Sequence, residues 1–437
     1  MADDFSDHIF RPNRRAVVAG LAAGGFLTLN HTARAESPSV ALRCKESLFS
    51  LREKAPATQV GSLGDQPLRF KRGERVEISL ANELPAPVVL NWRGIDGTAA
   101  IEPLLARSPL APSASTGFEL PSRHAGTYLC DPALLGDGAA RPFRALPLIV
   151  SENEPVRVDR DEVLLIEGWR LKADGAAIAP GTDPAGTNPV YTVNGELAQD
   201  IKARGRERLR LRFVNALQRG VIALKIEHHD VTVMALDGQP AEPFLARNGA
   251  FALAPGGRAD VFVDVAPGSA NSQILMHDGE AARPIARLLL SDDAPARTEN
   301  LPPAPALPSN GLPAHLDLKN ALRIDLPFGG DQKDWLRPAA FAATAPPAFR
   351  AKTGRTVVLS LINRATLTSV FHLHGHHFRL LDRLDDSWKP FWLDTIAVDA
   401  GQTQRVAFAA EYPGRWLIEA AETNWSAPKL LRWFSVE

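Results

Sequence analysis

The stretch GERVEISLAN at residues 73–82 decides the fold, because the chain repeats it twice. It recurs as RERLRLRFVN at 206–215 and as GRTVVLSLIN at 354–363. Each copy is a short turn followed by alternating apolar and polar residues, which is the period-two pattern of a half-buried strand. The copies begin at 73, 206 and 354, so they are 133 and 148 residues apart. This spacing predicts three similar β-domains in tandem.

Turn-forming residues outside these copies also favour β-sandwich domains. The chain contains 35 prolines and 32 glycines, and it lacks any long apolar pattern with helical period. A proline-rich segment at 296–315 predicts a linker between the last two domains. We therefore expect an all-β chain with domains at residues 40–155, 156–295 and 316–437.

The first 35 residues have the features of an export signal. Arg14 and Arg15 precede an apolar run from Ala16 to Leu29, and a small-residue cleavage pattern follows. This order predicts a cleaved signal of the twin-arginine type over residues 1–35. The alternative is a membrane anchor, but the run is shorter than the ~20 apolar residues that a spanning helix needs. We expect a mature chain in the bacterial periplasm, without a transmembrane segment.

The charge of the predicted mature chain excludes several classes of partner. Without residues 1–35, the chain carries 45 basic and 47 acidic residues. A nearly neutral chain indicates neither nucleic acid nor anionic lipid as partner. Cys44 and Cys130 are the only cysteines. An oxidising compartment permits a disulfide between them, and two separate buried thiols are the alternative.

Four histidines gather in the stretch HLHGHHF at residues 372–378. His372 and His374 stand two residues apart, so on a strand they would point to the same side and could share a metal ion. The alternative is that both are hydrogen-bonding residues in a buried polar network. His376 and His377 would face opposite sides by the same alternation, and we expect one of them to be exposed.

Four motifs resemble those of one enzyme family. The stretch FHLHGHHF at 371–378 resembles the third-domain copper motif of multicopper oxidases such as laccases. The stretches VNG at 193–195, VMALDGQP at 233–240 and PGGRAD at 255–260 resemble parts of the second domain of that family. The resemblance extends along nearly the whole predicted mature chain. It implies three tandem cupredoxin-like domains, each a Greek-key β-sandwich.

The resemblance also implies which positions would hold copper. The family uses a blue copper, held by Cys, two His and usually Met, and a trinuclear cluster held by eight His. Carried over position by position, the resemblance retains one pair of cluster ligands, His372 and His374. The six other ligand positions of the implied cluster carry Asn91, Arg93, Asp131, Ala133, Glu419 and Ala421, and Trp425, at the next histidine position, completes the implied pocket. Three implied blue-copper positions carry Ser369, Ala420 and Leu430.

The residue content of the third predicted domain does not suit a blue copper. Residues 316–437 contain no Cys and no Met, and no His follows Cys130 before His228. We therefore expect no laccase-type oxidation, no catalytic residue and no cofactor. In this loss and in its export signal, the chain resembles the copper-free member of the superfamily that acts in bacterial cell division. The expected function is non-redox binding or structural support, with an unidentified periplasmic protein as partner.

Two hypotheses concern the implied pocket. In the first, His372 and His374 form a mononuclear copper or zinc site completed by Asp131 or Glu419, and the chain is a residual oxidoreductase. A guanidinium at Arg93 would disfavour binding of a dication there. In the second, Arg93 forms an ion pair with Glu419 or Asp131, which replaces the metal as a clasp between the first and third domains.

Overall fold

The structure is a computed structural model, and it describes residues 38–51, 57–268, 271–330, 332–382 and 387–437. Within these ranges the regular structure is β-strand, apart from three short 3₁₀ helices: η1 (Ala99–Ile101), η2 (Arg247–Gly249) and η3 (Pro338–Ala340). The prediction of an all-β chain is confirmed. The predicted export signal, residues 1–35, lies outside the described residues. In the described part of the chain, no helix has the length and apolar character needed to cross a membrane.

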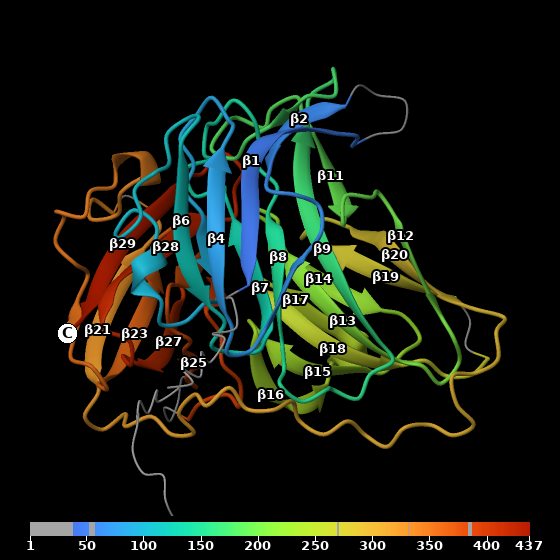
Figure 1. Cartoon of the computed structure of the whole chain (residues 1–437). Coiled ribbons are helices and arrows are strands. Elements are labelled where there is room, and N and C mark those ends of the chain that lie inside the picture. The colour runs from blue at the N-terminus through green and yellow to red at the C-terminus, as the bar shows by residue number, and fades with distance from the viewer. Residues whose placement is uncertain (1–37, 52–56, 269–270, 331, 383–386) are drawn as a thin grey trace, which may run out of the picture. The chain divides into compact units, whose positions relative to one another are not determined.

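The strands form three consecutive groups of two sheets each (Figure 1). The first group contains β1 (Ser39–Phe49), β2 (Thr58–Ser62), β3 (Leu68–Lys71), β4 (Arg75–Asn82), β5 (Asn91–Arg93), β6 (Ser115–Pro121), β7 (Gly126–Asp131) and β8 (Leu146–Ser151). Its sheets have the orders β2-β1-β4-β6 and β3-β8-β7-β5.

The second group contains β9 (Arg160–Leu171), β10 (Ala177–Ile178), β11 (Asn188–Val193), β12 (Gln199–Ala203), β13 (Arg208–Asn215), β14 (Ile222–Ile226), β15 (Val231–Leu236), β16 (Gln239–Leu245), β17 (Ala250–Leu253), β18 (Arg258–Asp264), β19 (Ser272–His277) and β20 (Ala282–Leu290). One sheet has the order β10-β9-β13-β18-β15-β16, with β11 also on β9, and the other has the order β12-β20-β19-β14-β17.

The third group contains β21 (Leu322–Phe328), β22 (Arg350–Ala351), β23 (Thr356–Asn363), β24 (Ser369–Leu373), β25 (Arg379–Leu380), β26 (Thr395–Val398), β27 (Thr403–Ala409), β28 (Gly414–Glu422) and β29 (Lys429–Val436). Its sheets have the orders β21-β23-β27-β25 and β22-β29-β28-β24-β26. The histidine motif begins on β24 of the second of these sheets and continues past the end of that strand.

The three repeat copies occupy the same place in their groups. They form β4, β13 and β23, and each pairs in parallel with the first strand of its group, β1, β9 or β21. Each also pairs antiparallel with a later strand, β6, β18 or β27. The repeat therefore marks a central strand, which is paired with a neighbouring strand along both edges.

Each copy ends in an asparagine, and the hydrogen bonds of its side chain explain why this residue recurs. Asn82, Asn215 and Asn363 are buried at the ends of β4, β13 and β23. The side-chain oxygen of each accepts a hydrogen bond from the backbone N–H two residues later, at 2.9–3.0 Å. The amide nitrogen of each donates to two carbonyls. One side chain thus closes the turn after the strand and leaves no buried polar atom of its own unpaired.

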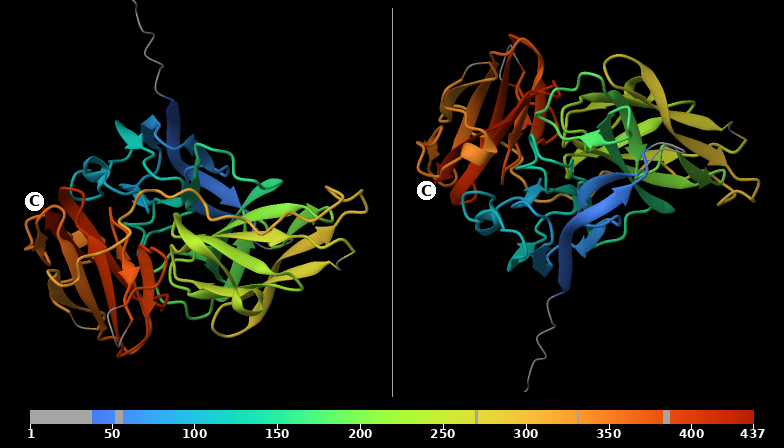
Figure 2. Two further views of the ribbon diagram at one scale, coloured as in Figure 1. Left: turned by 90° about the horizontal axis from the view of Figure 1, so that it is seen from below. Right: turned by 90° about the horizontal axis from the view of Figure 1, so that it is seen from above.

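Each group encloses a hydrophobic core, and the groups pack together. The cores are formed by residues from 42–150, 164–288 and 326–436. Figure 2 shows the third group, in orange and red, beside the first, in blue and cyan. The described residues, from 38 onward, belong to a single compact unit. The predicted domain boundaries therefore remain a prediction.

The two cysteines lie in the core of the first group. Cys44 on β1 and Cys130 on β7 are both fully buried, and both are free thiols in the structure. Burial raises the pKa of the Cys44 thiol to about 12 and that of Cys130 well above its usual value. Of the two alternatives for these residues, the structure shows the pair of buried thiols.

Candidate functional site

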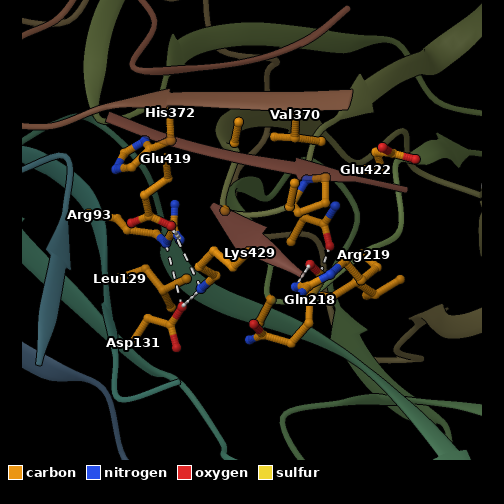
Figure 3. Close-up of a pocket in the computed structure, with 17 residues that line it drawn as sticks. Arg93, Leu129, Asp131, Gln218, Arg219, Val370, His372, Glu419, Glu422 and Lys429 are labelled. Atoms are coloured by element: carbon orange, nitrogen blue, oxygen red, sulfur yellow. Dashed lines mark hydrogen bonds and ion pairs between the residues drawn. The ribbon is translucent and has the colours of Figure 1, made fainter. Parts of the chain in front are cut away.

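The candidate site is a polar pocket where the first and third groups of strands meet, beside the second (Figure 3). It is lined by residues that include Arg93, Asp131, Gln218, Arg219, His372, Glu419 and Lys429. The space open to a water molecule is about 40 Å³, which is enough for a few waters. The pocket is therefore defined mainly by the charged and polar side chains that line it.

Strand alternation places the ionisable residues of the third group on one face of its sheet. Phe371 on β24 and Ile418 on β28 belong to the core of the third group, whereas the neighbouring His372 and Glu419 line the pocket. His372 and Glu419 are directly paired across the two strands. Lys429 begins β29, whose Leu431 is paired with Glu419, so lysine and glutamate are diagonal neighbours.

Glu419 receives three hydrogen bonds at the centre of this face. Arg93 Nη2 donates to Oε2 at 2.7 Å, and His374 Nε2 contacts Oε1 at 2.7 Å. The amide nitrogen of Asn91 also donates to Oε1. Burial alone would raise the pKa of Glu419, but the charges of Arg93, Lys429 and His374 hold that pKa well below its usual value. Glu419 is therefore a buried carboxylate ion.

His374 joins two carboxylates with its two ring nitrogens. Nδ1 lies 2.8 Å from Glu102 Oε1, and Nε2 lies 2.7 Å from Glu419 Oε1. A carboxylate ion only accepts hydrogen bonds, so both ring nitrogens must carry protons. Burial lowers the pKa of His374, but Glu102 and Glu419 outweigh burial and raise it to about 9. Both ring nitrogens of His374 are thus engaged by carboxylates, an arrangement that favours its imidazolium form.

Three cations and three carboxylates form the complete network: Arg93, His374 and Lys429 with Glu102, Asp131 and Glu419. Three of its contacts join the first group to the third. They are Arg93 to Glu419 at 2.7 Å, Glu102 to His374 at 2.8 Å, and Asp131 to Lys429 at 3.8 Å. The predicted pairing of Arg93 with Glu419 is thus present, and Arg93 Nε also lies 3.6 Å from Asp131.

Lys429 is the least satisfied member of the network. Its Nζ lies 3.7 Å from Glu419 and 3.8 Å from Asp131, distances that are longer than hydrogen bonds. This buried atom has no hydrogen-bond partner. Figure 3 shows its side chain between the two carboxylates, at the edge of the pocket.

His372 is a neutral counterpart of His374. Its Nδ1 lies 2.9 Å from Thr395 Oγ1 and 3.4 Å from Asp394. Burial and the nearby charge of Arg93 lower the pKa of His372 to about 4. Among the described residues, one group of three could hold a metal ion: His372, His374 and Glu419, with candidate ligand atoms within 4.8 Å of one another. Asp131, the other predicted ligand, is not part of that group.

The remaining predicted positions are divided between the pocket and its surroundings. Ala421 lines the pocket. Ala133 is paired with Val89 in the first group. Trp425 lines a different pocket and donates from Nε1 to the carbonyl of Ala179 at 3.1 Å.

The implied blue-copper positions lie on the opposite face of the same sheet. Ala420 belongs to the core of the third group, and its strand partner Leu430 packs against that core. Ser369 is fully buried, and its hydroxyl donates to Asn363 Oδ1 at 3.2 Å.

The expectation that His376 or His377 is exposed is wrong. Both side chains are buried, with 2% and 3% of their surface exposed. The alternation rule fails because β24 ends at Leu373 and the chain turns at Gly375, which has a φ of 67°. A Cβ atom at Gly375 would lie 2.1 Å from the ring of Trp416, so glycine is required there.

Sequence reasoning missed two charged members of the network. Glu102 follows the η1 turn, where no motif marks it. Lys429 lies next to Leu430, which the resemblance assigned, but its role depends on strand register. A signal for Lys429 was available, because the period of two places residue 429 on the face opposite to residue 430.

Comparisons with known proteins agree with this arrangement of sheets. Two family models, both described as multicopper oxidase, match residues 163–283 and 315–437. The multicopper oxidase MmcO of Mycobacterium tuberculosis is 25% identical over 414 residues, covering 80% of this chain and 77% of the relative.

Two solved structures share the fold. A multi-copper oxidase from Pseudomonas thermotolerans has a TM-score of 0.77 at 22% identity, covering 92% of this chain and 99% of the other. A multi-copper oxidase from Pseudomonas parafulva has a TM-score of 0.75 at 22% identity, with 91% and 100% covered. Together with the family matches, these findings show that the chain belongs to the multicopper oxidase superfamily.

Proposed function

We propose that this chain is a non-redox member of the superfamily, exported to the periplasm by the twin-arginine route, which acts through binding or structural support of a periplasmic protein. The observation that carries the proposal is His374, whose two ring nitrogens are both held by carboxylates. A histidine in this state offers no lone pair to copper. The family's ligand position is occupied by an ion pair.

The residues around His374 do not suit the copper ions of the family. A blue copper needs a cysteine thiolate, and residues 316–437 contain no cysteine. A trinuclear cluster needs eight imidazoles, whereas the ionisable side chains beside His374 include two fixed cations, Arg93 and Lys429. Positive charge within 4 Å of the shared carboxylate opposes a bound dication. The pocket is suited to internal ion pairs and not to a metal cluster.

In this proposal the network is a clasp between the first and third groups of strands. Each of its three crossing contacts joins a cation to a carboxylate, so no buried charge is left uncompensated. Breaking a buried pair by removing one partner typically costs about 3–5 kcal/mol. In this proposal the clasp takes the place of the metal that the family resemblance implies between the first and third groups.

Metal content is the decisive measurement. We would purify the protein from the periplasm, reconstitute portions with copper and with zinc, remove free metal, and measure metal per chain by mass spectrometry. A double variant, His372→Ala with His374→Ala, is measured in parallel. We expect far less than one metal ion per chain in both proteins and no oxidation of phenolic substrates by either.

A matched control is available in His228 and His229, two adjacent histidines in the turn between β14 and β15, of which His228 is exposed. Replacing both with alanine reports adventitious binding by imidazoles outside the candidate site. One metal ion per chain that is retained in this control and lost in the variant of His372 and His374 would contradict the proposal.

The second candidate function is that of an oxidoreductase with one copper or zinc ion. It is favoured by the grouping of His372, His374 and Glu419 within 4.8 Å. Binding there requires His374 to lose a proton and release one of its two carboxylates, and it requires Glu419 to exchange Arg93 for the metal. Stoichiometric metal in the experiment above would select this candidate.

A further inference from the structure

A second buried histidine, His377, lies where all three groups of strands meet. It belongs to the third group, and its Nδ1 lies 2.8 and 2.9 Å from the two carboxylate oxygens of Asp96 in the first group. Its Nε2 lies 2.9 Å from the backbone carbonyl oxygen of Asp237 in the second group. One imidazole ring therefore joins three segments that are far apart in the sequence.

The two partners of His377 fix its protonation by hydrogen-bond geometry. An ionised carboxylate and a carbonyl oxygen both accept hydrogen bonds and donate none. A neutral imidazole donates from one nitrogen only. The lone pair on its second nitrogen would then face an acceptor oxygen less than 3 Å away. Loss of one proton would thus break the link either to Asp96 or to Asp237, and so either to the first or to the second group.

The other charged groups around the ring agree with this protonation. Asp394, before β26, lies 3.6 Å from Nε2, but it is held by Arg258 of β18 at 2.6 Å. The carboxylate of Asp237, in the β15–β16 turn, accepts three backbone N–H groups. Asp96 also contacts His124, which precedes β7, at 3.1 Å.

The side chains behind Asp96 add little positive charge. Glu411 and Tyr412 precede β28. Burial raises the pKa of each side chain, and the negative charge of Asp96 raises it further. His376 is enclosed by aromatic rings, and burial lowers its pKa to about 4, so it is neutral. The His377 imidazolium is the direct positive partner of the Asp96 carboxylate at 2.8 Å.

We propose that the His377 imidazolium is an alkaline-sensitive latch that holds the three groups of strands together, so that loss of its proton loosens their packing. Arginine keeps its charge at any relevant pH. Arg258 therefore continues to hold Asp394 and to donate to the Thr127 carbonyl of the first group at 3.2 Å. The alkaline form is loosened and not dissociated. The latch uses no residue of the proposed clasp, and it stands whether or not that proposal is correct.

The expected direction of the pH effect follows from the position of the proton. Burial lowers the pKa of His377, and Asp96 outweighs burial and raises it from 6.5 to about 9. A histidine whose pKa is raised by folding contributes stability that is complete below its unfolded pKa and is lost as pH rises through its folded pKa. The contribution of His377 is therefore present at pH 6.5 and lost by about pH 9.

The first test is thermal unfolding of the full chain, without added metal, across the interval from pH 6.5 to above pH 9. The variants are His377→Gln, which removes the titrating group, and His228→Gln, an exposed histidine as matched control. We expect the melting temperature of the wild type and of the control to fall over this interval, and that of His377→Gln to fall less. Equal pH dependence in all three proteins would overturn the proposal.

The second test needs no variant, so it remains decisive if His377→Gln does not fold. Hydrogen exchange of the wild type is measured at pH 7 and pH 9.5 and corrected for the intrinsic exchange rate. We expect protection to fall around Asp96 and the β15–β16 turn more than in β13, a central strand of the second group. Unchanged protection, or an equal loss in all three places, would show that His377 is not a latch.

Discussion

The two faces of the sheet formed by β24, β28 and β29 differ in chemistry although they share the same strands. The outer face, toward the first group, carries His372, His374, Glu419 and Lys429, joined to partners across the interface. The inner face carries Ser369, Ala420 and Leu430 within or against the core. By resemblance, the outer positions match the cluster pocket and the inner ones match the blue copper.

The comparison shows that the side chains packed against each face determine which residue types can stand at the positions that the resemblance assigns to copper ligands. The outer face meets carboxylates and cations from β5, β7 and the η1 turn, so charged residues there find partners. The inner face meets aromatic and aliphatic side chains of the facing sheet, such as Phe328 of β21 and Phe408 of β27. A charge there would be buried without a partner, so small or apolar residues are the ones that fit. The predictions below test whether the two faces differ in energy as they do in composition.

The largest effect is expected for Glu419→Ala on the outer face. This change leaves Arg93, His374 and Lys429 with two carboxylates for three cations. We expect a loss of stability of about 3–5 kcal/mol, because a buried charge is left unpaired. Chemical denaturation measures it.

Glu242→Ala is the control for that change, since Glu242 is exposed on β16. A surface substitution of this kind is expected to stay within about 0.5 kcal/mol of the wild type. If the denaturation curves of the two variants coincide, the outer face contains no clasp.

A matched pair of serines tests the two faces with the same chemical change. Ala420 faces the core, and its neighbour Ala421 faces the pocket. Ala420→Ser buries a hydroxyl among apolar side chains and should cost about 1–3 kcal/mol. Ala421→Ser places the same hydroxyl beside polar groups and should cost less than about 0.5 kcal/mol. Similar losses of unfolding free energy for both variants would mean that the two faces do not differ in polarity at these two positions.

The sequence predicted the positions of the two histidines and the Arg93–Glu419 pair, but not the role of Lys429. His372 on β24 and His374 just after its end lie two residues apart, so a period of two was enough to place both on one face. The pairing of Arg93 with Glu419 followed from the family resemblance and is present at 2.7 Å. The role of Lys429 depends on the register of β28 with the next strand, β29, which the alternation within a single strand does not fix.

The positions of Glu102 and His377 could not be predicted from the sequence, for different physical reasons. Glu102 enters the site after a short 3₁₀ turn, where no periodicity exists to be read. The buried position of His377 depends on Asp96 and Asp237. These residues come from the other two groups, and only the packing of the three groups brings them together.

The smallest effect is expected for Lys429→Met, which sharpens the account of the outer face. The ammonium group makes no hydrogen bond, and its two carboxylates are already paired with Arg93. Removing it gives up two long ion contacts and also relieves the cost of burying a charge, terms that often cancel. We expect a loss below about 1 kcal/mol by chemical denaturation.

A large loss for Lys429→Met, close to that of Glu419→Ala, would place Lys429 at the centre of the clasp. It would also imply that water in the pocket completes the hydrogen bonds of its ammonium group, because an unsolvated ion could not contribute so much. A small loss would leave Glu419 as the centre, with its bonds to Arg93, His374 and Asn91 sufficient to hold the two groups of strands. The strength of the outer face would then depend on hydrogen-bonded ion pairs and not on the number of charges gathered there.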